Sequence, residues 1–251
     1  MIYIQDLIKT LPDRKLFEID SLSINKNEKI ALIGENGKGK TTLVNMILNQ
    51  ENIWMHPNLK IGYFSQMSDI LEEDADILTN VLNTSIYDET KTRIVLARLG
   101  FKTNDVYKIV SILSDGEKAK VKLAKILTSD FNFLIFDEPT NFLDINAIEG
   151  LEKLLKSYDR PFIFVSHDEE FINNLADTLL IIEDKRIKNF KGSLSQYKNK
   201  KEKTTSSKDR DSLLLDFRIS SISSRLAMEL PKEARKKLEE EYNKLIEERK
   251  K

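Results

Sequence analysis

Cysteine is absent from this sequence of 251 residues. Its absence excludes a disulfide framework and a zinc site built from thiolates, so a reducing cytoplasm is the simplest expected location. No apolar run approaches the roughly 20 residues that a membrane-spanning helix needs. The opening residues, MIYIQDLIKT, lack the basic segment and the long apolar core of a signal peptide. We therefore expect a cytoplasmic chain without a transmembrane segment.

An excess of charge of one sign is also missing, because 40 Lys and Arg residues face 41 Asp and Glu residues. The balance nevertheless changes along the chain. Residues 198–251 hold 16 basic and 11 acidic side chains, whereas the first 197 residues hold 24 and 30. A basic tail on an acidic body fits an anionic partner such as nucleic acid. Charge alone favours the simpler interpretation of a solvated charged helix.

Short apolar runs alternate with helical patterns over residues 1–197, which predicts an α/β domain. We expect strands at 29–33, 61–65, 133–137, 162–166 and 179–182. Near-continuous apolar runs of this kind are typical of strands that helices cover on both faces. The stretch of about 67–125 lacks strand character in its first part and predicts a small helical insert.

The C-terminal region has a different pattern. Residues 198–210 are polar without an apolar period, so we expect a linker. Residues 211–251 carry two helical stripes, Leu215, Ile219, Ile222 and Leu226, then Leu238, Tyr242 and Leu245. Their spacing predicts a helical extension in which a hairpin buries the two stripes against each other.

The nine residues GENGKGKTT, at 34–42, lie between an expected strand and a helical run at 43–48. This is the P-loop pattern in the strand–loop–helix context that it requires. Its glycines let backbone amides close around a phosphate, Lys40 reaches the β- and γ-phosphates, and Thr41 offers a hydroxyl to Mg²⁺. The pattern predicts an ATP site formed by Gly34, Asn36, Gly37, Lys38, Gly39, Lys40, Thr41 and Thr42.

Two acids follow four apolar residues at 133–136. A buried strand would deliver the first acid, Asp137, to the Mg²⁺ shell. The second, Glu138, would be the general base that polarises the attacking water. An apolar strand that ends in two acids is common by itself, but beside a P-loop it predicts nucleotide hydrolysis.

Residues 113–117, LSDGE, resemble the signature motif of the ABC ATPase superfamily. Other motifs stand in family order: Gln66 at the Q-loop position, PTNFLD at the D-loop position of residues 139–144, and His167 at the switch-histidine position. Over roughly residues 1–190 the chain therefore resembles an ABC nucleotide-binding domain. The resemblance implies the ABC type of the P-loop NTPase fold, with a small helical subdomain.

The resemblance also implies roles for particular residues. Glu138, His167 and Gln66 would be catalytic, and Thr41, Gln66 and Asp137 would hold Mg²⁺. Ser114, Asp115, Gly116 and Glu117 would complete the ATP site of a second domain in trans, with Asp144 in the D-loop. Asp115 is a departure, because the family has glycine there and a carboxylate beside a γ-phosphate is repulsive. Leu11 is a second departure, because the family has an aromatic residue near this position that stacks on adenine. The aromatic residues Phe17 and Tyr3 are not at the matching place.

PTNFLD, Tyr107-Lys108 before the signature, and residues 192–197, GSLSQY, resemble the ABC-F group. Proteins of this group act on ribosomes and usually carry two nucleotide domains. This sequence has one P-loop, and its tail resembles the extension after the second domain. The resemblance implies the C-terminal half of a longer protein, with a second nucleotide-binding domain (in the same chain or a homodimer) and the ribosome with its RNA as partners. Phe142 stands where many relatives have histidine, and in this the sequence resembles the ABC-F branch that protects ribosomes from antibiotics.

Two other functions stay open. The first is the ATPase subunit of an ABC transporter, and the second is a degenerate domain that binds ATP as a structural ligand. The short spacing between Gln66 and Leu113 and the PTNFLD segment favour the ribosomal function over the transporter. Intact Lys40, Glu138 and His167 argue against a purely structural ligand.

Overall fold

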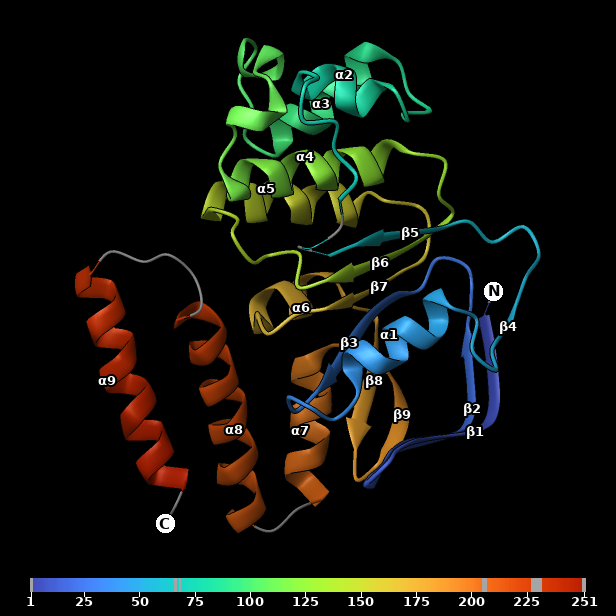
Figure 1. Cartoon of the computed structure of the whole chain (residues 1–251). Helices are drawn as coiled ribbons and strands as arrows, with labels where there is room; N and C mark the ends of the chain where they lie inside the picture. The colour runs from blue at the N-terminus through green and yellow to red at the C-terminus, as the bar shows by residue number, and fades with distance from the viewer. Residues whose placement is uncertain (1, 66, 68, 205–206, 227–231, 250–251) are drawn as a thin grey trace.

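The structure, a computed structural model, describes the chain except residues 1, 66, 68, 205–206, 227–231 and 250–251. The side chains of 202–204, 207–216, 232–234 and 248–249 lie outside the description as well. Figure 1 shows a twisted sheet with helices on both sides, a group of helices above one end, and two long helices at the C-terminal side. In the described part of the chain, no helix is both long and apolar enough for a membrane crossing.

A mixed sheet runs through the described residues in the order β4-β1-β2-β9-β8-β3-β7-β6-β5. Its strands are β1 Ile2–Leu11, β2 Arg14–Ile24, β3 Lys29–Gly34, β4 Trp54–Met55, β5 Ile61–Phe64, β6 Phe133–Asp137, β7 Phe162–Val165, β8 Thr178–Glu183 and β9 Arg186–Lys191. Strands β8, β3, β7, β6 and β5 are parallel to one another. The loops that follow them therefore meet at one edge of the sheet, where ligands bind in α/β folds.

The five strands expected from the sequence are confirmed as β3, β5, β6, β7 and β8, with ends within one residue of the expected ones. The sequence did not single out β1, β2 and β9. Their apolar residues alternate with polar ones, because one face of each strand meets the core and the other meets solvent.

The helices are α1 Lys40–Leu48, α2 Ile77–Leu82, α3 Glu89–Arg98, α4 Asp115–Thr128, α5 Ile145–Lys156, α6 Glu169–Leu175, α7 Leu194–Thr204, α8 Ser207–Leu226 and α9 Lys232–Arg249. Two short 3-10 turns, η1 Asp105–Tyr107 and η2 Val110–Ile112, lead into α4. Alternating residues of the central strands feed two cores. In β6, Leu134 and Phe136 pack toward α4 and α5, whereas Phe133 and Ile135 pack toward α1.

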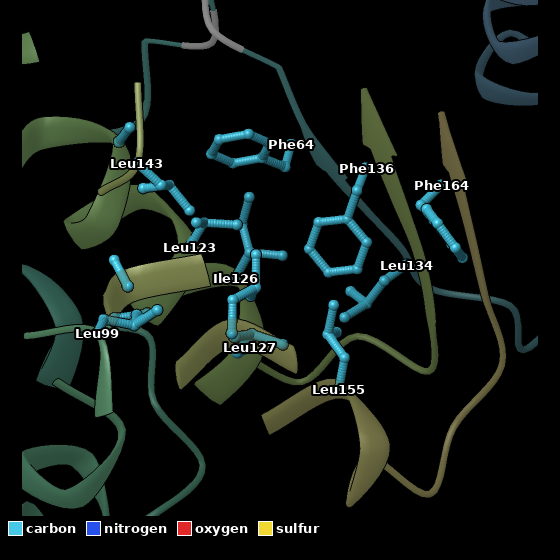
Figure 2. Close-up of a cluster of buried hydrophobic side chains, with 14 of the residues drawn as sticks. Phe64, Leu99, Leu123, Ile126, Leu127, Leu134, Phe136, Leu143, Leu155 and Phe164 are labelled. Carbon is cyan, nitrogen blue, oxygen red and sulfur yellow. The ribbon is translucent and has the colours of Figure 1, made fainter. Parts of the chain in front are cut away.

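Figure 2 shows the core under α4 and α5, where Leu123, Ile126 and Leu127 of α4 meet Phe136 of the sheet. Gly150 of α5 lies at the border with the helical insert. A Cβ at this position would stand 1.7 Å from the carbonyl oxygen of Arg98, at the end of α3. The two backbones thus touch directly, and only glycine permits this approach.

The C-terminal hairpin is confirmed. Ile219 and Ile222 of α8 and Leu245 of α9 are buried together, with Leu226, Leu238 and Tyr242 partly buried around them. The side chain of Leu215, the first residue of the expected stripe, lies outside the described residues.

The stretch expected as a linker, 198–210, is largely helical where it is described. Helix α7 runs into it as far as Thr204, and α8 begins at Ser207. Lysine and glutamate favour helix even without an apolar stripe, which explains why a polar composition was a poor guide. Whether this stretch separates two domains stays a prediction.

Candidate functional site

The P-loop connects β3 to α1 at the edge of the sheet where the parallel strands end. Gly37 and Gly39 have φ values of 74° and 109°, in the left-handed region that favours glycine. Gly39 is the N-cap of α1 and makes no side-chain capping bond, and the first turn of the helix contains no acid. The amides at this helix start are therefore not capped by a side chain and carry the positive end of the helix dipole, as an anion site requires.

Gly39 has a second reason to lack a side chain. A Cβ there would stand 2.7 Å from Cε1 of Phe17, which is fully buried beneath the loop. Phe17 thus supports the P-loop and is not free to stack on a base. Tyr3, the other aromatic considered for that role, is 38% exposed and donates its hydroxyl hydrogen bond to Gln5 at 2.8 Å.

Lys40 lies inside its own loop. Its Nζ donates to the carbonyl oxygens of Gly34 at 2.7 Å and Glu35 at 3.3 Å, and to Oδ1 of Asn36 at 3.3 Å. Burial lowers the pKa of Lys40, while the charges of Glu138 and Asp137 oppose that shift. The ammonium group is therefore placed between the loop and the two acids.

The other predicted residues of the loop lie near its surface. Lys38 forms an ion pair with Glu35 at 3.0 Å. Thr41 and Thr42 stand in the first turn of α1, exposed and partly exposed. Arg14 donates to the carbonyl oxygen of Gly37 at 3.2 Å, a contact that the sequence gave no signal for.

Asp137 ends β6 and Glu138 begins the next loop, as predicted. Glu138 has φ 52°, and its amide donates to the carbonyl oxygen of Val165 at 3.0 Å. This turn directs the two consecutive acids into the same buried region. Burial raises the pKa of Asp137, against the effect of Lys40. Burial, and next the charge of Asp137, raise the pKa of Glu138 to about 7.

His167 follows β7, the strand beside β6. Its Nε2 lies 3.3 Å from Oε1 of Glu138, so the structure brings these two predicted residues together. Burial, and next the charge of Lys40, lower the pKa of His167 to about 4, which keeps the ring neutral at physiological pH. On the other side of the ring, Nδ1 lies 3.0 Å from Oγ of Ser220 in α8. Ser220 had no role in the sequence prediction.

The signature residues form the start of α4. Ser114 is the N-cap and Glu117 completes a capping box: Ser114 Oγ accepts from the Glu117 amide at 3.3 Å, and Glu117 Oε2 accepts from the Ser114 amide at 2.9 Å. The spacing S-x-x-E is itself a capping signal that the sequence contains. Asp115 lines a cavity of about 280 Å³ with Phe64, Lys118, Ala119, Lys122 and Phe142.

The signature and the D-loop are in direct contact. A Cβ on Gly116 would stand 2.8 Å from the carbonyl oxygen of Phe142. Asp144 caps α5, accepting from the Ala147 amide at 2.9 Å, and pairs with Lys120 of α4. These contacts join two motifs that the sequence separates. Gln66, predicted as catalytic and as a Mg²⁺ ligand, lies outside the described residues.

Comparison with known proteins decides the family. Residues 17–141 match the family described as ABC transporter. The chain contains an ABC nucleotide-binding domain. It is 38% identical over 196 residues to the erythromycin resistance ATP-binding protein MsrA of Staphylococcus epidermidis, covering 76% of this chain and 37% of the relative. It is 33% identical over 205 residues to the ribosome protection protein VmlR of Bacillus subtilis, covering 79% and 37%.

The curated relatives include ABC-F proteins, so the predicted resemblance to that group is confirmed. The chain spans only 28% to 39% of the length of the curated relatives that it matches. Among solved structures, RNase-L Inhibitor matches with a TM-score of 0.66 and 22% identity over 80% of this chain and 41% of that one. This likeness confirms the predicted ABC type of P-loop NTPase fold.

Proposed function

We propose that this ABC nucleotide-binding domain binds and hydrolyses ATP for an ABC-F-like protein that acts on the ribosome. The observation that carries the proposal is the meeting of four groups at one edge of the sheet: the P-loop with Lys40, the acids Asp137 and Glu138, and His167. They come from three parallel strands, β3, β6 and β7, or from the loops that follow them, and together they match the needs of phosphoryl transfer.

The P-loop fits the phosphates of ATP. The start of α1 has no competing side-chain cap, and a Cβ at Gly39 would collide with Phe17, so that part of the loop stays open backbone. Lys40 would exchange its loop carbonyl contacts for phosphate oxygens, which are better partners for a cation. Thr41 and Asp137 offer the oxygen ligands that Mg²⁺ prefers, with Gln66 as the third predicted ligand. When bound, Mg²⁺ neutralises the charge that develops on the phosphates.

Glu138 is suited to the role of general base. Its pKa of about 7 lets it take a proton from water near neutral pH. His167, neutral and held 3.3 Å from Glu138, would offer Nε2–H to a phosphate oxygen or to the water. The remaining component is a second domain. Ser114, Asp115, Gly116 and Glu117 would act on the ATP of that partner, and the partner's signature would complete this site.

The ribosomal function is supported by relatives whose names describe ribosome protection and erythromycin resistance. We propose the ribosome, including its RNA, as the partner, with protection from an antibiotic as the more specific role. A ribosomal partner would place the protein in the cytoplasm.

The decisive experiment uses Glu138→Gln in the full-length protein, combined with the equivalent change in any second domain. Glutamine keeps the shape of the side chain but cannot accept the proton. ATP should bind, hydrolysis should stall, and the protein should co-sediment with ribosomes in ATP and much less in ADP. Capture by membranes that carry transporters, with no capture by ribosomes, would replace the ribosomal function with the transporter alternative. Unchanged ATP turnover would remove Glu138 from the mechanism.

A further inference from the structure

Among the described residues, Ser220 of the C-terminal hairpin contacts one of the proposed catalytic side chains. Ser220 of α8 is partly buried, and its Oγ lies 3.0 Å from Nδ1 of His167. The other ring nitrogen, Nε2, lies 3.3 Å from Glu138. The imidazole is therefore held from both sides, once by the nucleotide-binding domain and once by the extension.

The chemistry of the contact sets the positions of the protons. When Glu138 is ionised it can only accept, so its carboxylate, 3.3 Å from Nε2, favours the tautomer with the hydrogen on that nitrogen. Nδ1 of a neutral ring is then an acceptor, and the Ser220 hydroxyl donates to it. A hydroxyl can also accept, so Ser220 stabilises the Nε2–H tautomer in combination with the carboxylate of Glu138 on the other side of the ring. Without the hydroxyl, that tautomer and the ring orientation lose one of their two fixed partners.

Contacts other than that of Ser220 also hold α8 against the nucleotide-binding domain. Phe217, three residues earlier, packs against the main core. Nζ of Lys198 in α7 lies 4.8 Å from the centre of the Phe217 ring and pairs with Glu169, the first residue of α6. Because His167 stands two residues before that glutamate, these contacts join α6, α7 and α8 next to the segment that carries the histidine. The packing keeps the hydroxyl in register with the ring.

We propose that Ser220 is a positioning residue for His167, and that the C-terminal hairpin supports hydrolysis by holding the histidine as an Nε2–H donor. The inference rests on the proposed ATPase function. It predicts that displacement of the hairpin, for example by a partner that binds it, changes the rate of hydrolysis while the P-loop still binds ATP.

The test compares three variants in the full-length protein. Ser220→Ala should lower kcat by about 3- to 10-fold, the effect of one lost hydrogen bond, with the ATP dissociation constant unchanged. Ser220→Thr keeps the hydroxyl and should restore most of the rate. Ser223→Ala, on the exposed side of the same helix, is the matched control and should leave the rate as it is.

A second readout follows the histidine itself. The sequence contains two histidines, His56 and His167, so ¹⁵N imidazole spectra of the chain are simple to assign with a His56→Gln variant. Ser220→Ala should shift the His167 nitrogen resonances toward a mixture of tautomers, while Ser223→Ala should not. An unchanged His167 spectrum and an unchanged kcat in Ser220→Ala would overturn the inference.

The two levels of the proposal fail in different ways. If Lys40→Ala binds ATP as tightly as the parent, the proposed function fails. If Lys40→Ala loses ATP but Ser220→Ala matches the parent in both rate and spectrum, only the role of Ser220 is wrong. If Ser220→Ala unfolds, the ¹⁵N spectrum of the parent still decides, because the inference requires the His167 hydrogen on Nε2.

Discussion

Helices α1 and α4 both begin in glycine-containing motifs that the sequence assigns to phosphate, yet their first turns are built in opposite ways. Helix α1 starts at Gly39 with no side-chain cap and no acid in its first turn. Helix α4 starts at Ser114 with a complete capping box and has Asp115 and Glu117 in its first turn. The start of α1 has no side-chain cap in place of an anion, whereas at the start of α4 the amides of Ser114 and Glu117 are already bound by the capping box.

To bind phosphate, the two motifs would therefore need different rearrangements. The P-loop needs only the rearrangement of Lys40 away from the carbonyl oxygens of its loop. The signature needs Ser114 to leave Glu117, and it needs the charge of Asp115 to be turned away or paired. Under the proposed function, a γ-phosphate from a second domain would meet a higher cost at α4 than ATP would meet at α1.

The largest effect is expected when a side chain is placed in the P-loop. Gly39→Ala combines a positive φ with a Cβ 2.7 Å from Phe17, and should lower the free energy of unfolding by about 2–4 kcal/mol. Gly37→Ala is the matched control, because its φ is positive but nothing lies within 4 Å of the added Cβ, and it should lose about 1 kcal/mol. Urea unfolding measures both. Equal losses would mean that Phe17 does not restrict the loop.

The next effect is on ATP binding. Lys40→Ala should weaken Mg-ATP binding by about 2 kcal/mol, or roughly 30-fold, because a charged phosphate contact disappears. Lys26→Ala, in an exposed turn before β3, should leave the affinity unchanged. Isothermal titration calorimetry compares the two. Equal affinity in Lys40→Ala and the parent would remove the P-loop assignment.

A smaller effect is expected at the capped helix. Ser114→Ala removes the acceptor for the Glu117 amide and should lower the free energy of unfolding by about 1 kcal/mol. Thermal unfolding of the isolated chain is the measurement. Ser111→Ala, at an exposed position just before the motif, serves as the control. A stability equal to that of the parent would show that the capping box contributes nothing in solution.

The same cap predicts a pH dependence. Hydrogen bonds from the Ser114 amide and hydroxyl lower the pKa of Glu117 below its usual 4.5. A lowered carboxyl pKa stabilises the folded state above pH 4.5, and this contribution is lost as the pH falls through the folded value. Glu117→Gln should therefore show a flatter stability profile than the parent below pH 4.5. Profiles of equal slope would contradict the cap.

The smallest effect is expected at Asp115, where a substitution should lower stability but should not lower ATP-driven association. Asp115→Gly removes an acid from the first turn of α4 and should cost the isolated chain a few tenths of a kcal/mol to about 1 kcal/mol of stability. It should also raise, or at least not lower, ATP-driven association of two chains, because a like charge beside the γ-phosphate is gone. Analytical ultracentrifugation with and without ATP measures the association. A clear loss of dimer would give Asp115 a favourable role.

The part of the site that the sequence predicts well is the part encoded in local patterns. The P-loop, Asp137 with Glu138, and the five parallel strands all lie in contiguous segments whose period or spacing is visible. Parallel strands end at the same edge of the sheet, and the pairing of β6 with β7, which the structure shows, brings Glu138 and His167 together there.

The contacts that the sequence did not predict are between segments far apart. Ile219 and Ile222 belong to an apolar stripe and predict a helix, but Ser220 lies between them and its partner depends on where α8 is placed. Phe17 is an aromatic residue near the expected stacking position, but its place against Gly39 depends on how β2 and the P-loop pack together. Residues 114–117 fit two patterns at once, the ABC signature and a capping box between Ser114 and Glu117, and the spacing alone does not separate them.

The backbone contact at Gly150 has a mechanical consequence. Where side chains separate two helices, rotamer changes let one slide along the other. At Gly150 no side chain lies between the two helices, because the carbonyl oxygen of Arg98 packs directly against the backbone of Gly150 in α5. The end of α3 is thus fixed at backbone distance from α5, and any side chain at position 150 would push the two helices apart.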